Sequence, residues 1–415
     1  MKKILFPLFL IPISIFLGYQ ILSLWQGIAL YQRAPSKERL LKATEFNRSN
    51  PDPFYKLSLL YQWDIQNIDL KEALRYLREA IKRNPLEQQY YLHLAKLLYR
   101  SGDENASEQA LERAILLFPA GFQGRWVSGN LFLQQGRIEK AIPHFAYLLA
   151  NYPNQSGLVY EVLFKGMKDS DWIFEKVVPK NRLSMNQYLA YLYEIGDKES
   201  AKKAWKKKSS YGIQSNRQED LRHIEFLIAQ RDFREAYRVW MSRLEEEGFP
   251  IPSDGNLITN GGFEKREILG GGFDWRVNKV SGAETSIDPS TAYEGKISLK
   301  IVFNGKENVD FHHVYQFVPV KPNTEYRLKA HLKTKEITTK SGIKIEVTGI
   351  GSGFHASSES LIGDNEWKEV DLLFRTPAQS QGAQVRVRRE RTDKFDRYIS
   401  GTVWVDNVSL KEVRH

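Results

Sequence analysis

Residues 86–119 read LEQQYYLHLAKLLYRSGDENASEQALERAILLFP, and the pattern of this 34-residue stretch recurs along the first half of the chain. Four prolines keep the same interval: Pro51, Pro85, Pro119 and Pro153. In the same frame, small and large residues alternate at spacings of four and three, which places them on one face of an α-helix. These positions are Ala73, Leu77 and Ala80, then Ser107, Leu111 and Ala114, and then Ala141, Phe145 and Leu148. Small residues let two helices approach closely, so the stretch predicts repeated pairs of antiparallel helices.

The turns between the paired helices keep the interval too, because Gly102-Asp103 and Gly136-Arg137 are 34 residues apart. Glycine supplies the positive φ that ends a helix. After Pro153 the frame fades, and helical pairs return around two further turns at 196–197 and 231–232. The economical prediction is a helical solenoid over residues 36–248.

This pattern resembles the tetratricopeptide repeat over about residues 54–155, with Gly129 at the glycine of the family's first helix. The resemblance implies a concave groove, lined by the first helix of each pair, that binds a protein partner. The residues implied to face the groove are Gln62, Lys96, Tyr99, Arg100, Trp126 and Asn130. An equally open interpretation is that these positions are solvated or packed locally.

The second half of the chain follows a different period. Pro, Gly and Ser interrupt the helical pattern and predict a linker at residues 249–255. Short segments with a period of two then follow at 298–303, 325–333, 343–347, 369–374, 383–388 and 401–405. They predict one antiparallel β-sandwich over residues 256–415. The predicted fold class is therefore multidomain α + β, with an N-terminal transmembrane helix, an α-helical solenoid and a C-terminal jelly roll.

The two ends of the sandwich carry recognisable motifs. Asn256-Leu-Ile-Thr-Asn-Gly-Gly-Phe-Glu264 and Gly401-Thr-Val-Trp-Val-Asp-Asn-Val-Ser-Leu410 resemble those of the jelly-roll carbohydrate-binding modules attached to bacterial xylanases and cellulases, which are galactose-binding-like sandwiches. The resemblance implies a carbohydrate ligand. It also implies a structural calcium ion, held by Glu264 and Asp406, that ties the first strand to the last. The alternative is that these two carboxylates pair with lysines.

Sugar binding in such modules rests on aromatic rings that stack on pyranose rings, with hydrogen-bonding side chains around them. The candidate carbohydrate-binding residues are Trp275, Tyr315, Phe354, His355, Arg386 and Arg388. Strand alternation directs both arginines to one face, as it does Arg327, Lys329, His331 and Lys333 on the 325–333 segment. If these segments share a sheet, its face is a basic stripe suited to an acidic glycan. A solvated and partly neutralised face is equally open.

The amino terminus predicts a membrane anchor. Met1-Lys2-Lys3 precedes an apolar run from Ile4 to about Trp25, which is long enough for a hydrocarbon core of about 30 Å. No small-x-small cleavage site follows, so an uncleaved anchor over residues 1–30 is favoured over a signal peptide or a buried helix. The lysines would lie in the cytoplasm. This predicts a single-pass protein of the bacterial inner membrane whose folded domains are periplasmic or extracellular.

Composition excludes several classes of function. The 415 residues are 42% hydrophobic and 27% charged, which is typical of globular domains and excludes wholesale disorder. The chain has no cysteine, so disulfides, thiolate metal sites and cysteine nucleophiles are excluded. A net charge of +10 favours an acidic partner surface. No HExxH, GxSxG, phosphate-loop or nucleic-acid recognition motif is present, which indicates a non-enzymatic protein without a nucleic-acid partner.

Together these patterns predict a membrane-anchored scaffold that binds a protein through its repeats and a glycan, acidic or neutral, through its sandwich. A role in bacterial cell-envelope or exopolysaccharide assembly follows from pairing these two kinds of domain. Two alternatives stay open. The sandwich could hold an unrecognised polysaccharide-modifying site, or it could bind only proteins.

Overall fold

The computed structural model describes residues 5–32, 36–65, 68–246, 251–252 and 255–413. The chain forms two compact units. The first unit extends to Tyr191 and includes Lys203–Trp205, and the second comprises Leu192–Lys202 and the residues from Lys206 onward. The second unit begins within helix α11 (Arg182–Ile195). Most of α12 (Lys198–Ser210) and all of α13 (Arg217–Ala229) and α14 (Phe233–Glu246) therefore fall in the same unit as the sandwich, and the predicted boundary at 249–255 stays a prediction. Of that predicted linker, only residues 251, 252 and 255 lie within the described part of the chain.

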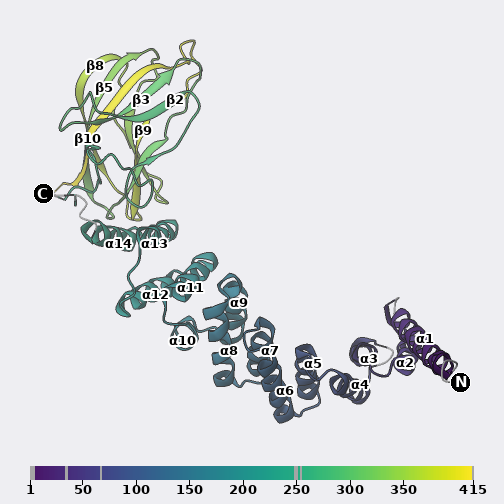
Figure 1. Ribbon diagram of the computed structural model, residues 1–415. Coiled ribbons are helices and arrows are strands. Elements are labelled where there is room, and N and C mark those ends of the chain that lie inside the picture. Colours follow the sequence, from purple (N-terminus) through teal and green to yellow (C-terminus); the bar gives the residue numbers. More distant parts are fainter. Residues whose placement is uncertain (1–4, 33–35, 66–67, 247–250, 253–254, 414–415) are drawn as a thin grey trace. The chain divides into compact units, whose positions relative to one another are not determined.

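Within each unit, helices that are neighbours in the chain pack side by side (Figure 1). Their bounds are α1 Leu5–Gln32, α2 Lys37–Phe46, α3 Pro51–Trp63, α4 Leu70–Arg83, α5 Gln88–Arg100, α6 Glu104–Leu117, α7 Phe122–Gln134, α8 Ile138–Asn151, η1 Pro153–Gln155, α9 Ser156–Met167, α10 Ser170–Lys176, α11 Arg182–Ile195, α12 Lys198–Ser210, α13 Arg217–Ala229 and α14 Phe233–Glu246. Pairs α3–α4, α5–α6 and α7–α8 are the predicted 34-residue repeats.

The predicted repeat register is confirmed by burial and by close contacts. All nine small and large positions listed above are at most 1% exposed. The buried hydroxyl of Ser107 donates to the Ala95 carbonyl 2.8 Å away, which fixes α6 against α5. Gly129 on α7 lies under the Phe145 ring, where an added Cβ would approach ring carbons to 3.0 Å. A larger residue at this position would require the Phe145 ring to shift by a few tenths of an ångström, so the glycine favours the close packing of α7 and α8.

The N-terminal helix does not have the predicted character. Spanning a bilayer takes about 20 consecutive apolar residues, and the described side chains of α1 include Ser14, Gln20, Ser23 and Gln26. No helix in the described part of the chain is long and apolar enough to cross a membrane. The predicted single-pass anchor at residues 1–30 is wrong, and so are the inner-membrane location and periplasmic exposure inferred from it. Lys2 and Lys3 lie outside the described residues.

The C-terminal sandwich consists of two antiparallel five-stranded sheets. Sheet 1 has the order β2–β3–β10–β5–β8, and sheet 2 has the order β1–β4–β9–β6–β7. The strands are β1 Arg276–Val277, β2 Ala283–Asp288, β3 Ser298–Asn304, β4 Val314–Pro319, β5 Glu325–Ile337, β6 Lys344–Gly349, β7 His355–Ser357, β8 Gly363–Arg375, β9 Gly382–Arg388 and β10 Ser400–Glu412. All six predicted strand segments lie within or overlap these strands.

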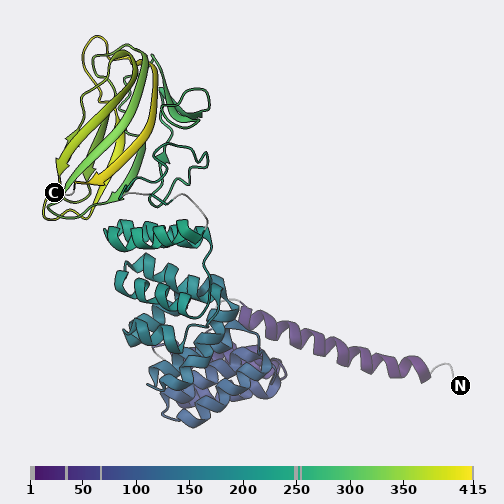
Figure 2. The same cartoon turned by 90° about the vertical axis from the view of Figure 1, so that its left-hand side faces the viewer.

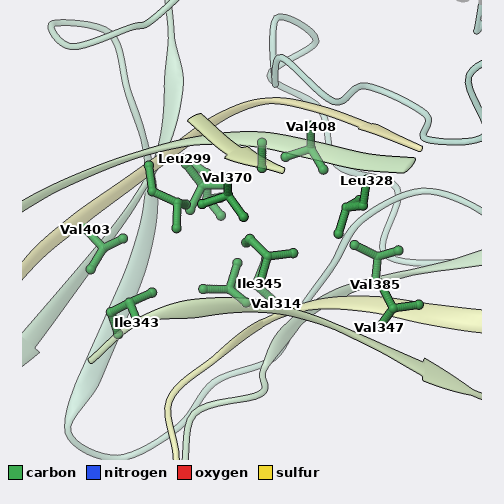
Figure 3. Packing of buried hydrophobic residues seen from close by; sticks show 14 of the residues in the cluster. Leu299, Val314, Leu328, Ile343, Ile345, Val347, Val370, Val385, Val403 and Val408 are labelled. Atoms are coloured by element: carbon green, nitrogen blue, oxygen red, sulfur yellow. The ribbon is translucent and has the colours of Figure 1, made fainter. Parts of the chain in front are cut away.

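The core of the sandwich lies between the sheets (Figure 3). Leu299, Leu328 and Val403 of sheet 1 face Val314 and Ile345 of sheet 2. Each alternate side chain therefore points outward, so each sheet presents one outer face.

Helices α13 and α14 pack against one end of the sandwich within the second unit, as Figure 2 shows from the side. Trp240 of α14 is 1% exposed, and its indole N–H donates to Thr259 Oγ1 at 3.3 Å. Phe233 lies edge-on to Phe317 of β4, with ring centroids 6.4 Å apart. Gly382 faces the Phe233 ring so closely that any Cβ would collide with it. The helical pair and the sandwich thus share a buried apolar contact.

Candidate glycan-binding face

The outer face of sheet 2 gathers most of the candidate residues on one surface, here called the arginine face. Its members are Arg276, Tyr315, Phe317, Glu346, His355, Arg386 and Arg388. The strand register sets Tyr315, Arg386 and Glu346 side by side across β4, β9 and β6. The inward positions between them are buried and mostly aliphatic, such as Val385 and Val347, and the exception is Gln316, which bonds to the Thr259 backbone. Alternation along three strands therefore builds this polar surface.

Glu346 is the centre of the arginine face and is buried. Its Oε1 accepts from Arg386 Nη2 at 2.9 Å and lies 2.6 Å from His355 Nε2. Arg388 Nε lies 3.3 Å from Oε2, within ion-pair distance. Among the described residues, Glu346 Oε2 and the Nε atoms of both arginines are buried without a hydrogen-bond partner. This network therefore has hydrogen-bonding capacity that the protein itself does not use.

The charges of the arginine face are balanced in pairs. Burial by itself raises the pKa of Glu346, but the hydrogen bonds and charges of Arg386 and His355 outweigh it and hold that pKa below its ordinary value. Arg388 also pairs with Asp310. Arg276 pairs with Glu225 of α13 at 2.6 Å. Because each arginine has a carboxylate partner, the face is polar without being strongly basic.

Aromatic rings border this network. Tyr315 is half-buried beside Phe317, with ring centroids 5.5 Å apart, and the Arg276 guanidinium lies 4.7 Å from the Phe317 ring. Phe317, Glu346 and Arg276 were not among the predicted site residues. The alternation of the 343–347 segment places Glu346 on the outer face, and that signal could have identified it.

Two predicted residues lie elsewhere. Trp275 is 1% exposed, stacks on Phe263 and donates its indole N–H to the Asn260 carbonyl at 3.0 Å. Its ring is part of the core, so it offers no face to a sugar. Phe354 packs on Phe374 with ring centroids 5.8 Å apart, and only its neighbour His355 reaches the arginine face.

The predicted basic stripe does not form one surface. Arg327, Lys329 and Lys333 are on β5 in sheet 1, whereas Arg386 and Arg388 are on β9 in sheet 2. The β5 cations pair with carboxylates of the adjacent β8. Lys329 lies 2.8 Å from Glu369, Lys333 lies 2.6 Å from Glu366, and Arg327 lies 3.3 Å from Asp371. The outer face of sheet 1 is therefore neutralised.

Glu264 and Asp406, the predicted calcium ligands, both hold the loop between β2 and β3. Glu264 Oε1 accepts from the backbone N–H groups of Lys296 and Ile297, at 2.7 and 3.1 Å. Asp406 Oδ2 accepts from Tyr293 N at 2.7 Å, and its Oδ1 accepts from Asn407 N at 2.7 Å. Burial raises the pKa of Asp406, and the nearby charge of Glu264 adds to this.

These contacts fit a calcium site only in part. Calcium takes six to eight oxygen ligands, whereas three of the four carboxylate oxygens already accept backbone N–H groups. The described residues contain no group of three or more acidic or histidine side chains placed to hold a metal ion. Calcium binding at this loop stays a prediction.

In the first unit, the predicted groove residues have mixed environments. Lys96 and Arg100 are exposed one turn apart on α5, and the Arg100 guanidinium lies 4.5 Å from the ring of Trp63. Gln62 is buried, and Tyr99 is half-buried. Trp126 stacks on Phe122, and Asn130 donates to the Trp126 carbonyl at 2.8 Å. The exposed part of the predicted groove is thus basic and aromatic.

A separate hollow of about 520 Å³ lies between α6, α7 and α8. Arg125, Ser128 and Phe132 of α7 line it. At 100° per residue these positions lie on the opposite side of α7 from Trp126 and Asn130. The predicted groove and this hollow are therefore different surfaces.

Family models match both kinds of domain. The model described as a carbohydrate binding domain matches residues 255–394, and the tetratricopeptide repeat model matches residues 66–109 and 94–156. The chain therefore carries tetratricopeptide repeats in its N-terminal region and a jelly-roll domain of the carbohydrate-binding family at its C-terminus. Both are non-catalytic kinds of domain.

Two curated relatives match a short part of their own length. The tRNA(Glu)-specific nuclease WapA of Bacillus subtilis subsp. natto (strain BEST195) is 27% identical over 165 residues, which are 38% of this chain and 7% of the nuclease. The tRNA nuclease WapA of Bacillus subtilis (strain 168) is 26% identical over 166 residues, with the same two shares. The chain spans about 7% of the length of these relatives.

Solved structures are similar to separate parts of the chain. The CBM22-1-GH10 modules of Clostridium thermocellum endo-1,4-β-D-xylanase 10B, complexed with xylohexaose, are 12% identical and cover 39% of this chain and 29% of their own, with a TM-score of 0.28. TmCBM61 in complex with β-1,4-galactotriose is 17% identical and covers 39% of this chain and all of its own, with a TM-score of 0.27. MamA is 18% identical and covers 29% of this chain and 68% of its own, with a TM-score of 0.26.

Proposed function

We propose that the chain is a non-catalytic scaffold that binds a glycan on the arginine face of its sandwich and a protein on its tetratricopeptide repeats. The single observation that supports glycan binding is the network of Glu346 with Arg386, Arg388 and His355. It lies on the outer face of a sheet whose domain matches the carbohydrate-binding family model. A chain that binds both a protein and a glycan could hold the two together, which suits a role in polysaccharide assembly.

The ligand that best suits this face is a neutral glycan. A sugar hydroxyl both donates and accepts, so it can contact a carboxylate and a guanidinium in the same network. The pairing of each arginine with a carboxylate leaves little net charge to attract uronates. Tyr315 supplies an aromatic ring beside the network. The sequence predicts an acidic glycan instead, so binding to an acidic probe is the alternative result of the test described next.

The test is titration calorimetry of the full chain with xylohexaose, cellohexaose and β-1,4-galactotriose, and with an oligogalacturonate as the acidic probe. Binding to a neutral probe should change little with salt, because only exposed ion pairs are screened over about 8–10 Å. Tyr315→Ala should weaken binding roughly fivefold to tenfold. Tyr398→Ala, an exposed tyrosine on the loop before β10, is the matched control. Salt-sensitive binding to the oligogalacturonate alone would favour the acidic ligand.

For the repeats, the exposed Lys96, Arg100 and Trp63 favour a protein segment that carries carboxylates. A photo-crosslinker placed at Tyr99 should attach to this partner in the native cell. The same crosslinker at Glu112, beside the hollow on the other side of the repeats, is the control. The charge-reversing variant Arg100→Glu should reduce the crosslink at Tyr99. An unchanged crosslink would show that the partner does not use this basic patch.

A further inference from the structure

The outer face of sheet 1 carries an aromatic stack, of which only His331 belongs to the predicted basic stripe. The ring of Tyr293, on the loop between β2 and β3, lies flat on His331 of β5, with centroids 3.5 Å apart and an interplanar angle of 12°. Trp367 of β8 stands edge-on to Tyr293, with centroids 5.9 Å apart. We call these three residues the tyrosine shelf. His331 is buried under the stack, whereas Tyr293 is 47% exposed, so one face of its ring meets solvent.

Backbone hydrogen bonds hold the shelf in place. Asp406, fully buried on β10, accepts from the N–H groups of Tyr293 and Glu294 at 2.7 and 3.2 Å. The side chain of Asn407 donates to Glu294 Oε2 at 2.9 Å. Glu264 accepts from the N–H groups further along the same loop. Because the loop is fixed at both of its sides, Tyr293 needs little ordering when a ligand stacks on it.

The surroundings of the shelf match an uncharged, hydroxyl-rich ligand. The neighbouring cations are neutralised, since Lys329 pairs with Glu369 and Lys333 pairs with Glu366. Trp367 stands edge-on to the exposed Tyr293 ring, and the carboxylate of Glu369 lies 3.8 Å from His331 Nε2 beside the stack. An aromatic face with polar groups at its edge contacts both the C–H face and the hydroxyl groups of a pyranose ring.

We propose that the tyrosine shelf is a second carbohydrate-binding site, which takes a pyranose ring of a neutral glycan on the sheet opposite the arginine face. The two sites are on opposite outer faces of one sandwich, so a single domain can engage two glycan chains or two parts of one chain. Two linked weak sites raise the overall affinity for a polymer without any new contact.

The test uses the full chain labelled with 5-fluorotryptophan and the neutral probes xylohexaose and cellohexaose. The resonance of Trp367 is assigned from its loss in Trp367→Phe. On addition of probe, this resonance should shift in the wild type and also in Tyr315→Ala, because the shelf does not depend on the arginine face. The shift should require roughly tenfold more probe, or disappear, in Tyr293→Ala, and it should persist in Tyr293→Phe, which keeps the ring.

The outcomes separate this inference from the glycan site on the arginine face. A Trp367 resonance that no neutral probe moves at millimolar concentration overturns the shelf, even if calorimetry shows binding that depends on Tyr315. A shift that is equal in the wild type and Tyr293→Ala also overturns it. A Trp367 shift that persists while Tyr315→Ala has no effect on affinity supports the shelf and counts against the arginine face. Because Tyr293 is half exposed, its variants should fold, and an unchanged melting temperature checks this.

Discussion

Each outer face of the sandwich carries a buried carboxylate, and these two carboxylates have different kinds of hydrogen-bond partner. On sheet 2, Glu346 is surrounded by cationic side chains from neighbouring strands. On sheet 1, Asp406 accepts from the backbone N–H groups of Tyr293 and Glu294 in the loop that folds over it, and from Asn407 beside it on β10. The pKa of Glu346 is accordingly lowered and that of Asp406 is raised. The difference shows that charged side chains stabilise the outer face of sheet 2, whereas the backbone of a loop stabilises that of sheet 1, where the aromatic rings of the tyrosine shelf cover it.

The faces also differ in what covers their ends. Helices α13 and α14 pack against the end of sheet 2, through Trp240, Phe233 and the Glu225–Arg276 pair. Glu225 also accepts from Gly272 N at 2.6 Å, so one helical carboxylate holds both β1 and the loop before it. The arginine face therefore depends on helices outside the sandwich, and the tyrosine shelf depends on the sandwich itself.

The largest effect should come from removing this helical support. Trp240→Ala should destabilise the second unit by about 3–5 kcal/mol, the range for deleting a fully buried tryptophan. Thermal unfolding of the full chain measures this as a lower midpoint of the transition of that unit. Phe395→Ala is the control in the same unit, because this ring is fully exposed and its loss should cost under about 1 kcal/mol. Equal effects would mean that the helices do not support the sandwich.

The next prediction concerns calcium removal. It tests the loop on the outer face of sheet 1. An ion that binds only the native loop at Glu264 and Asp406 stabilises the protein by about 2.7 kcal/mol at a hundredfold excess over Kd. We expect a chelator to lower the unfolding midpoint of the full chain, and the double variant Glu264→Gln with Asp406→Asn to be insensitive to it. A wild-type midpoint that the chelator leaves unchanged would show that the backbone N–H groups alone hold this loop.

Glu346→Gln should have a somewhat smaller effect. The change removes the charge between Arg386 and Arg388, and breaking a buried ion pair costs about 3–5 kcal/mol. Because both arginines keep some solvent contact, we expect a loss on the order of 2–3 kcal/mol. Glu366→Gln on sheet 1 is the matched control, since this side chain is 87% exposed and its pair with Lys333 should contribute at most about 1 kcal/mol. A similar loss in both variants would remove the contrast between the faces.

The smallest effect is a pH dependence of opposite sign on the two faces. The lowered pKa of Glu346 means that its contribution is complete above the ordinary carboxyl pKa and is lost as pH falls through the lowered value. The raised pKa of Asp406 means that its contribution is complete below the ordinary pKa and is lost as pH rises through the raised value.

Unfolding midpoints of Glu346→Gln and Asp406→Asn, each compared with the wild type between about pH 7 and about pH 3, measure this difference. The penalty of Glu346→Gln should shrink toward low pH, and that of Asp406→Asn should grow. If both penalties changed in the same direction, the two carboxylates would not be solvated in the different ways described here.

Periodic features of the chain could be predicted from the sequence. The 34-residue interval specified the helical pairs because each helix must bury the same stripe against its neighbour. The period of two likewise specified which side chains of β9 point outward, so Arg386 and Arg388 could be placed on a surface. The sequence wrongly predicted that Trp275 binds sugar, because an aromatic ring next to glycines can lie either in an exposed loop or in the core, where this ring is found.

The length and sparse polar residues of the apolar run at the amino terminus predict an anchor, but no described helix meets the requirement for spanning a membrane. By itself the sequence determined the two kinds of domain, the repeat register and the direction of each strand residue, since these follow from local periodicity. Only the tertiary structure decided which strands share a sheet, and so which charges meet. It separated Arg327 from Arg386, joined Glu346 to His355, and laid Tyr293 on His331, because pairing between strands distant in sequence depends on the packing of the whole core.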